Sequence, residues 1–139
     1  MAHVDGDTIK VRERRPSGRR HTVRLIGIDA PETKRPGVAV ECGGPQASAS
    51  LARLAPIGAR VLLRTDPSQQ ERDRYGRLLA YVQRRGGDLG RVQIGRGWAT
   101  PYVYARKPFQ RLDAYRGAER DAARAGRGAH SLCGGDFHL

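Results

Sequence analysis

The chain has 139 residues, a formal net charge of +12 and 29% charged residues. This length suits one domain whose core buries roughly two thirds of the surface of the unfolded chain, so folding requires neither disulfides nor metal ions. The charge does not determine the fold, but it attracts polyanions at long range. The lack of any long apolar run in the sequence excludes a membrane-spanning helix.

Two strands joined by a tight turn are predicted at the start of the chain. Residues 8–15 predict a strand, because Ile9 and Val11 alternate with charged side chains, which is typical of a half-buried strand. The Pro-Ser-Gly run at 16–18 predicts a turn, and a second strand follows over residues 20–28. Residues 29–44 are rich in Pro, Gly and charge and predict a long loop, which in a small domain is usually functional or disordered.

Helical and strand patterns alternate in the rest of the chain. Residues 45–55 predict a helix that begins with a proline, a residue suited to the first helical turn. Residues 110–125 keep a helical period and end at glycines, which makes them the clearest helix. The remaining predicted elements are strands at 59–65 and 77–85 and a short helix at 89–97.

This order of elements predicts one domain over residues 1–139, in which 126–139 form a C-terminal tail. The fold class is α+β, mainly β, because several short strands accompany a few helices. We expect a five-stranded OB-fold barrel with about three helices, a fold whose face binds oligonucleotides.

Acidic side chains gather near the ends of the first predicted strands. Asp5 and Asp7 lie in an Asp-Gly-Asp-Thr run, Asp29 ends the second strand, and Glu32 follows three residues later. Adjacent strand ends can bring Asp7 and Asp29 together, where they repel each other unless a cation lies between them. A hard cation such as Ca²⁺ takes oxygen ligands only. The alternative is that Asp5 and Asp7 simply form a turn at a strand entry. An EF-hand is rejected, because the positions after the Asp-Gly-Asp-Thr run lack the acidic spacing of its calcium-binding loop.

Two arginines flank this acidic set. Arg24 lies within the second strand, and Arg77 follows a Tyr-Gly turn at the start of another strand. Each side chain can point outward into solvent, as most arginines do, or into a polar site. In the second case both guanidinium groups can bind one phosphate, and each preset donor lowers the barrier to its cleavage by about 3 kcal/mol.

Tyrosines supply flat rings for base stacking. Tyr75, Tyr102 and Tyr104 are the candidates, and stacking on such rings tolerates any base. The run at 102–104 also alternates like a strand, which would place both of its rings on one side. The alternative for this run is one more half-buried strand without a binding role.

These motifs together resemble the staphylococcal nuclease (thermonuclease) family, from residue 4 to about residue 126. Four matches in the order of the family carry the resemblance: Val-Asp-Gly-Asp-Thr at 4–8, Arg-Leu-Ile-Gly-Ile-Asp-Ala-Pro-Glu-Thr at 24–33, Asp-Arg-Tyr-Gly-Arg-Leu-Leu-Ala-Tyr at 73–81 and Tyr-Val-Tyr at 102–104.

The resemblance implies a calcium site. Asp7 and Asp29 match direct ligands, and the backbone carbonyl of Ala30 matches a further one. Asp5 matches an outer acid near the metal. Glu32 matches the carboxylate that activates the attacking water and contacts the metal through water.

The resemblance also implies the groups that hold the substrate. Arg24 and Arg77 match the two phosphate-binding arginines and, with Glu32, form the expected catalytic set. The expected substrate-binding residues are Tyr75, Tyr102, Tyr104, Arg74, Lys34 and Arg35.

The two cysteines, Cys42 and Cys133, are compatible with a disulfide or with two separate buried thiols. Some secreted relatives of the family carry paired cysteines, which favours the bridge. No leader opens the given chain, and a mature domain cut from a secreted precursor would look the same. We expect a secreted or cell-envelope protein rather than a cytoplasmic one.

The resemblance therefore predicts a Ca²⁺-dependent nuclease that cleaves DNA and RNA with little sequence specificity and leaves 3′-phosphates. We expect a monomer without a membrane partner. The alternative is a non-catalytic nucleic-acid-binding OB-fold module, because some relatives keep the barrel and lose the catalytic residues. The full set of Arg24, Asp7, Asp29, Glu32 and Arg77 favours catalysis.

Overall fold

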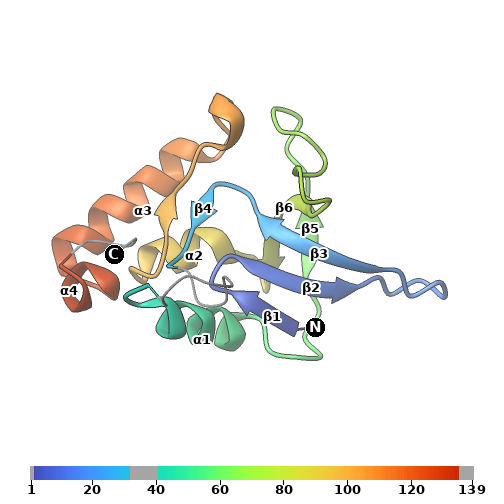
Figure 1. Cartoon of the computed structure of the whole chain (residues 1–139), viewed down its shortest axis with the longest axis horizontal. Helices are drawn as coiled ribbons and strands as arrows, with labels where there is room; N and C mark the ends of the chain where they lie inside the picture. Colours follow the sequence, from blue (N-terminus) through green and yellow to red (C-terminus); the bar gives the residue numbers. More distant parts are fainter. Residues whose placement is uncertain (1, 32–40, 135–139) are drawn as a thin grey trace.

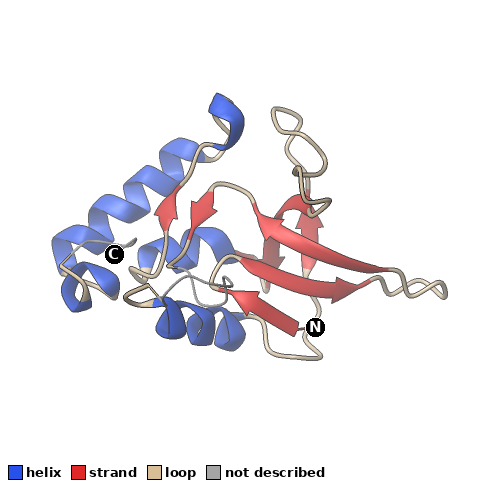
Figure 2. Ribbon diagram, in the orientation of Figure 1, coloured by secondary structure: helices blue, strands red, loops and turns tan. Residues whose placement is uncertain are grey.

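The computed structural model describes residues 2–31 and 41–134. It has a mixed α+β fold in which a strongly curled sheet, a partial barrel of the OB type, is covered by helices (Figure 2). The strands are β1 (Ala2–Asp5), β2 (Thr8–Arg12), β3 (Arg20–Leu25), β4 (Ile28–Asp29), β5 (Leu62–Arg64), β6 (Leu78–Arg84), β7 (Gly87–Asp88) and β8 (Thr100–Pro101).

The helices lie to one side of the curled sheet, and the β2–β3 hairpin projects away from them (Figure 1). None of the helices in the described ranges is long and apolar enough to cross a membrane. The helices are α1 (Gly44–Leu54), α2 (Leu89–Gly95), α3 (Leu112–Ala125), α4 (Ala129–Leu132) and the 3₁₀ turn η1 (Tyr104–Arg106).

The main sheet has the order β1-β2-β3-β6-β5, with β7 also paired to β6. The β2 and β3 strands are antiparallel, whereas β3 and β6 run parallel. Alternating residues of β2 and β3 face the core, and Ile9 and Val23 are fully buried there. The core continues between the sheet and the helices, where Tyr115 of α3 and Tyr81 of β6 are both buried.

The second predicted strand is divided in two. β3 ends at Leu25, and Gly27 turns the chain with a φ of +80° before β4 pairs with β8. A Cβ atom at Gly27 would lie 2.4 Å from the ring of Phe109, so only glycine fits this turn. The turn redirects the chain so that the Asp29 carboxylate lies near Arg24, at the end of β3.

The prediction of a strand at 102–104 is wrong. After β8 the chain leaves the sheet, and Tyr104 begins η1. Ala105 and Arg106 take positive φ values of 53° and 59°, which no regular strand accommodates. The expected long loop at 29–44 falls mostly on residues 32–40, which lie outside the described residues.

Candidate active site

A cleft with a volume of about 410 Å³ opens where three segments of the chain meet. These segments are the end of β3 with the following turn, the loop before β6, and the chain around η1. The cleft brings together residues that are far apart in sequence, and seven of the predicted site residues line it: Arg24, Asp29, Arg74, Tyr75, Arg77, Tyr102 and Tyr104.

Asp7 is fixed between β1 and β2 beside this cleft. Asp7 is only 7% exposed. One of its carboxylate oxygens accepts a hydrogen bond from the Thr8 hydroxyl and the other accepts one from the backbone N–H of Ala30, each at 2.9 Å. Its own carbonyl accepts the backbone N–H of Leu25 at 2.9 Å. These bonds hold the carboxylate against the end of β3.

Arg24 joins the two predicted metal-binding aspartates. Its Nη2 atom lies 3.5 Å from Asp7 Oδ2 and 3.7 Å from Asp29 Oδ1. Its Nη1 atom donates to the carbonyls of Leu25 at 3.0 Å and Ile28 at 2.6 Å, so the backbone of the Gly27 turn holds the guanidinium in place. The two carboxylates are therefore within 4 Å of the same nitrogen atom.

This donor set fits a hard cation. Asp7 and Asp29 offer carboxylate oxygens, and calcium completes such a set with carbonyl oxygens and water. Asp5, at the end of β1, pairs across the sheet with Thr8 and is therefore close in sequence and register to Asp7. No group of three or more His, Cys, Asp or Glu side chains gathers within residues 2–31 and 41–134, and Glu32 lies outside them.

Arg77 is held by a neighbouring carboxylate. Its Nε atom donates to Asp73 Oδ2 at 2.6 Å, while Asp73 Oδ1 accepts the backbone N–H groups of Tyr75 and Arg77 at 2.9 Å each. Burial alone would raise the pKa of Asp73, but these N–H donors and the guanidinium charge outweigh it and keep the pKa below its usual range. The ionised Asp73 thus orients Arg77 on the wall of the cleft.

The cleft tyrosines are partly open to solvent. Tyr75 is 67% exposed, and the guanidinium carbons of Arg74 and Arg77 lie 4.9 and 5.3 Å from the centroid of its ring. Arg74 also donates to the Tyr75 hydroxyl at 2.8 Å. Tyr102 is 44% exposed, and its ring centroid is 6.0 Å from the guanidinium carbon of Arg24. A guanidinium group therefore lies beside each of these two exposed rings.

Residues 22–131 match the protein family described as staphylococcal nuclease homologue. The chain belongs to the staphylococcal nuclease family. It is 38% identical over 120 residues to "Endonuclease YncB" of Bacillus subtilis (strain 168), a match that covers 86% of the chain and 54% of that relative. The "SPbeta prophage-derived endonuclease YokF" of the same organism is also 38% identical over 120 residues, covering 86% of the chain and 38% of the relative. "Thermonuclease" of Staphylococcus hyicus is 43% identical over 79 residues, 57% of the chain and 43% of the relative. The chain spans about half the length, or less, of these relatives.

Three predicted residues of this staphylococcal nuclease family chain lie outside the described residues: Glu32, Lys34 and Arg35. For Ala30 the structure gives a backbone N–H that donates to Asp7, and the predicted role of its carbonyl stays a prediction. Tyr104 lines the cleft from the start of η1 rather than from a strand.

Two acids that hold walls of the cleft by hydrogen bonding were not predicted from the sequence. Asp73 anchors Arg77, and its position four residues before the arginine and three before Gly76 is a turn signal that could have identified it. Asp66, 3% exposed, accepts bonds from Ser68, Tyr81 and Gln110. No local pattern marks Asp66, because its partners come from three separate segments.

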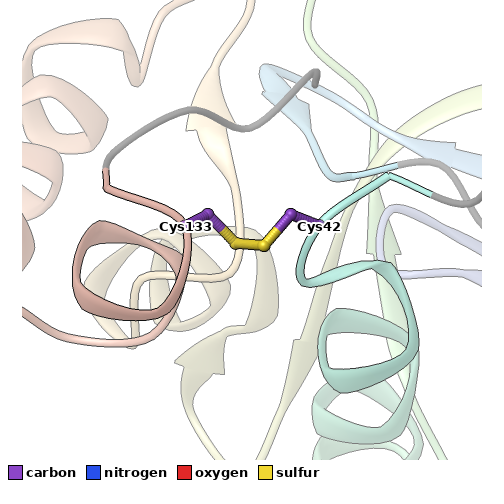
Figure 3. The surroundings of a disulfide bond; sticks show 2 residues. All are labelled: Cys42 and Cys133. Carbon is purple, nitrogen blue, oxygen red and sulfur yellow. A yellow bond between two sulfur atoms is a disulfide. The ribbon is translucent and has the colours of Figure 1, made fainter.

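A disulfide joins Cys42, just before α1, to Cys133, at the end of α4 (Figure 3). The pairing that the sequence left open is thus present in the structure. α4 is also held by close backbone contact, because a Cβ atom at Gly97 would lie 2.0 Å from the carbonyl oxygen of Arg127. The bridge and this contact fasten the end of the described chain beside α1.

Proposed function

We propose that this chain is a calcium-dependent nuclease that hydrolyses phosphodiester bonds of DNA and RNA with little sequence preference and leaves 3′-phosphates. The observation that carries the proposal is the position of Arg24. Its guanidinium reaches the carboxylates of both Asp7 and Asp29 and lines the same cleft as Arg77. Carboxylates beside a polyanion would weaken its binding unless a cation lies among them.

The described side chains suit each part of this reaction. Asp7 and Asp29 would hold the calcium ion, with the Ala30 carbonyl and water as further ligands. When bound, calcium supplies positive charge that neutralises and polarises the phosphodiester. Arg24 and Arg77 donate to the phosphate oxygens as negative charge develops on them, and each such donor contributes about 3 kcal/mol.

The proton of the attacking water needs an acceptor. We assign this role to Glu32 from the family resemblance, because a carboxylate within hydrogen-bonding reach of the water acts as a general base. Because the reaction then requires a deprotonated water, activity is expected to favour alkaline pH.

The substrate is held without reading of its bases. Exposed rings at Tyr75 and Tyr102 can stack on any base, and Tyr104 and Arg74 complete this wall of the cleft. Lys34 and Arg35 are assigned to substrate binding from the resemblance. Phosphate contacts carry no sequence information, which supports a broad specificity. The disulfide supports a secreted or cell-envelope location, since disulfides persist in oxidising compartments.

The test measures cleavage of plasmid DNA and of labelled RNA in Ca²⁺, in Mg²⁺ and in excess EGTA. We expect cleavage in Ca²⁺, its loss in EGTA, and its return when Ca²⁺ is restored. Treatment of the products with a phosphatase should be required before their 3′ ends can be extended. Asp29→Asn should abolish cleavage and weaken Ca²⁺ binding in calorimetry.

The matched control is Asp113→Asn, which removes an exposed acid on α3 that does not line the cleft. It should cleave and bind calcium as the parent chain does. Equal cleavage in EGTA, or equal Ca²⁺ binding by the two variants, would contradict the calcium site. A chain that binds both polymers but cleaves neither would replace the nuclease with the non-catalytic binding module.

A further inference from the structure

The β2–β3 hairpin projects from the rest of the molecule and is rich in positive charge. Residues 10–20 hold five arginines and one lysine against a single acid, Glu13. The hairpin extends away from the helices (Figure 1). Its tip is a folded turn, because Gly18 donates to the Arg15 carbonyl and Glu13 donates to the Arg19 carbonyl, each at 2.8 Å.

One face of this hairpin continues directly from the cleft. The register pairs Thr8 with Arg24, Lys10 with Thr22 and Arg12 with Arg20, so these residues share one face of the two strands. The other face carries the buried pair Ile9 and Val23. Lys10, Arg12 and Arg20, which we call the hairpin face, are exposed. Arg24 on the same face lines the cleft.

The distances suit an extended polyanion. Arg20 lies four residues before Arg24 on the same strand, which corresponds to about 13 Å between their Cα atoms. Along this length the charges of the hairpin face have one sign. The acid Glu13 is directed to the other side of the hairpin, because it pairs at 2.7 Å with His21, which lies opposite Val11 and not in the hairpin face.

The direct pairing of two arginines conflicts with the stability of the hairpin. Arg12 and Arg20 lie opposite each other across the strands, and like charges in that position destabilise an antiparallel pair. Features that break a local rule of stability are characteristic of functional sites. A bound polyanion removes the repulsion.

We propose that the hairpin face binds the phosphate backbone of a polynucleotide where it leaves the cleft. This rests on the proposed function, in which the cleft holds one phosphodiester near Arg24. The next phosphates along the strand then meet Lys10, Arg12 and Arg20. Arginine binds phosphate through two parallel hydrogen bonds, and the contact is independent of base sequence. A membrane surface fits less well, since the apolar side of these strands is buried in the core and has no residue to insert.

The test compares two triple variants that lose the same charge. One is K10Q/R12Q/R20Q in the hairpin face; the matched control is R116Q/R120Q/R124Q, three exposed arginines on α3. Figure 1 shows α3 on the opposite side of the molecule from the hairpin. Binding to a fluorescent 20-base-pair DNA duplex is measured by anisotropy in EGTA at several salt concentrations, so that cleavage plays no part.

We expect the dependence of log K on log salt to become shallower by about 2 to 3 in the hairpin variant, since each lost phosphate contact removes about 0.9 from the slope. The control variant should keep the slope of the parent chain. In Ca²⁺, the hairpin variant should show a raised KM on long DNA and an unchanged kcat/KM on a dinucleotide, whose single phosphodiester reaches no further than the cleft.

Equal salt slopes for the two variants would overturn the proposal. So would a hairpin variant that loses binding to anionic phospholipid vesicles while its DNA binding matches the control. Failure of the proposed function is distinguishable, because a chain that cleaves neither polymer still reports the binding slope. Cooperative thermal unfolding of both variants, with a melting temperature of the hairpin variant no lower than that of the parent chain, shows that each comparison is made between folded proteins.

Discussion

Asp66 offers a sharp test of how the walls of the cleft are held, and the test does not depend on catalysis. One carboxylate oxygen accepts the backbone N–H and the hydroxyl of Ser68 at 2.9 and 2.7 Å. The other accepts the Tyr81 hydroxyl at 2.5 Å and the backbone N–H of Gln110 at 2.8 Å. This one side chain therefore links the loop before Arg77 to β6 and to the chain that follows η1.

Replacing Asp66 with asparagine keeps the shape and removes the charge. The amide group can accept from only one pair of donors and turns an NH₂ group toward the other pair. Two hydrogen bonds to a charged acceptor are then lost, at about 1.5 to 3 kcal/mol each. We expect Asp66→Asn to lower the free energy of unfolding by about 3 kcal/mol or more at pH 7, measured by urea denaturation. Ser68→Ala, which removes a single donor, should lower it by about 1 kcal/mol.

The stabilisation that Asp66 provides should be lost as the pH falls. Burial would raise the pKa of Asp66, but hydrogen bonds from Ser68, Tyr81 and Gln110 keep it below its usual range. Stabilisation by a carboxylate with a depressed pKa is present above the unfolded pKa of about 3.9 and is lost as the pH falls through the folded pKa. The unfolding curves of the parent chain and Asp66→Asn should therefore converge below about pH 4. The reasoning would be refuted if the free energies of unfolding of the variant and the parent chain at pH 7 differed by less than about 0.5 kcal/mol, which is half of one net hydrogen bond. It would also be refuted if their difference stayed constant down to about pH 2.

Three further changes probe the site and the fold. Arg77→Lys should lower kcat about 10²- to 10³-fold in single-turnover cleavage, since a point charge does not replace the fork; a rate near that of the parent chain would exclude this role. Serine in place of both cysteines should lower the free energy of unfolding by about 4 kcal/mol, because the bridge closes a long loop, and a denaturant midpoint that does not move would contradict this. Gly27→Ala, which meets the ring of Phe109 at positive φ, should cost about 2 to 5 kcal/mol. Gly58→Ala, also at positive φ but in open space, should cost only about 1 to 2 kcal/mol, and equal losses would show that the ring contact has no effect.

Much of the fold could be predicted because its elements carry strong local patterns. The helix expected at 110–125 is α3, Leu112–Ala125, and the strand expected at 77–85 is β6, Leu78–Arg84. The ends of the first hairpin were harder to place. Residues 13–15 are all charged, so the alternation ends at Arg12, and the observed strand ends there although 8–15 had been predicted. The division of the second strand depends on Gly27 and on a ring from residue 109, which no local window contains.

Local sequence patterns also predicted part of the site, whereas contacts between distant segments determine the rest. Asp7 and Asp29 were expected to meet because they lie at adjacent strand ends, and Arg24 was expected to flank them; the structure places all three together. Asp66 was not expected, because two of its donors, Tyr81 and Gln110, come from distant segments. The role of Asp73 was not predicted either, although its turn pattern before Gly76 and Arg77 marks it. The roles of the catalytic residues, Glu32 included, stay predictions.

The covalent link between residues 42 and 133 also changes what a protease can do to the molecule. A single cut between them leaves both fragments attached, because the backbone from 42 to 133 and the bridge form a closed ring. The ring includes Arg77 and all three cleft tyrosines, whereas Asp7, Arg24 and Asp29 lie outside it and are held by the sheet. A nicked molecule can therefore keep both halves of its cleft together for as long as its surroundings remain oxidising.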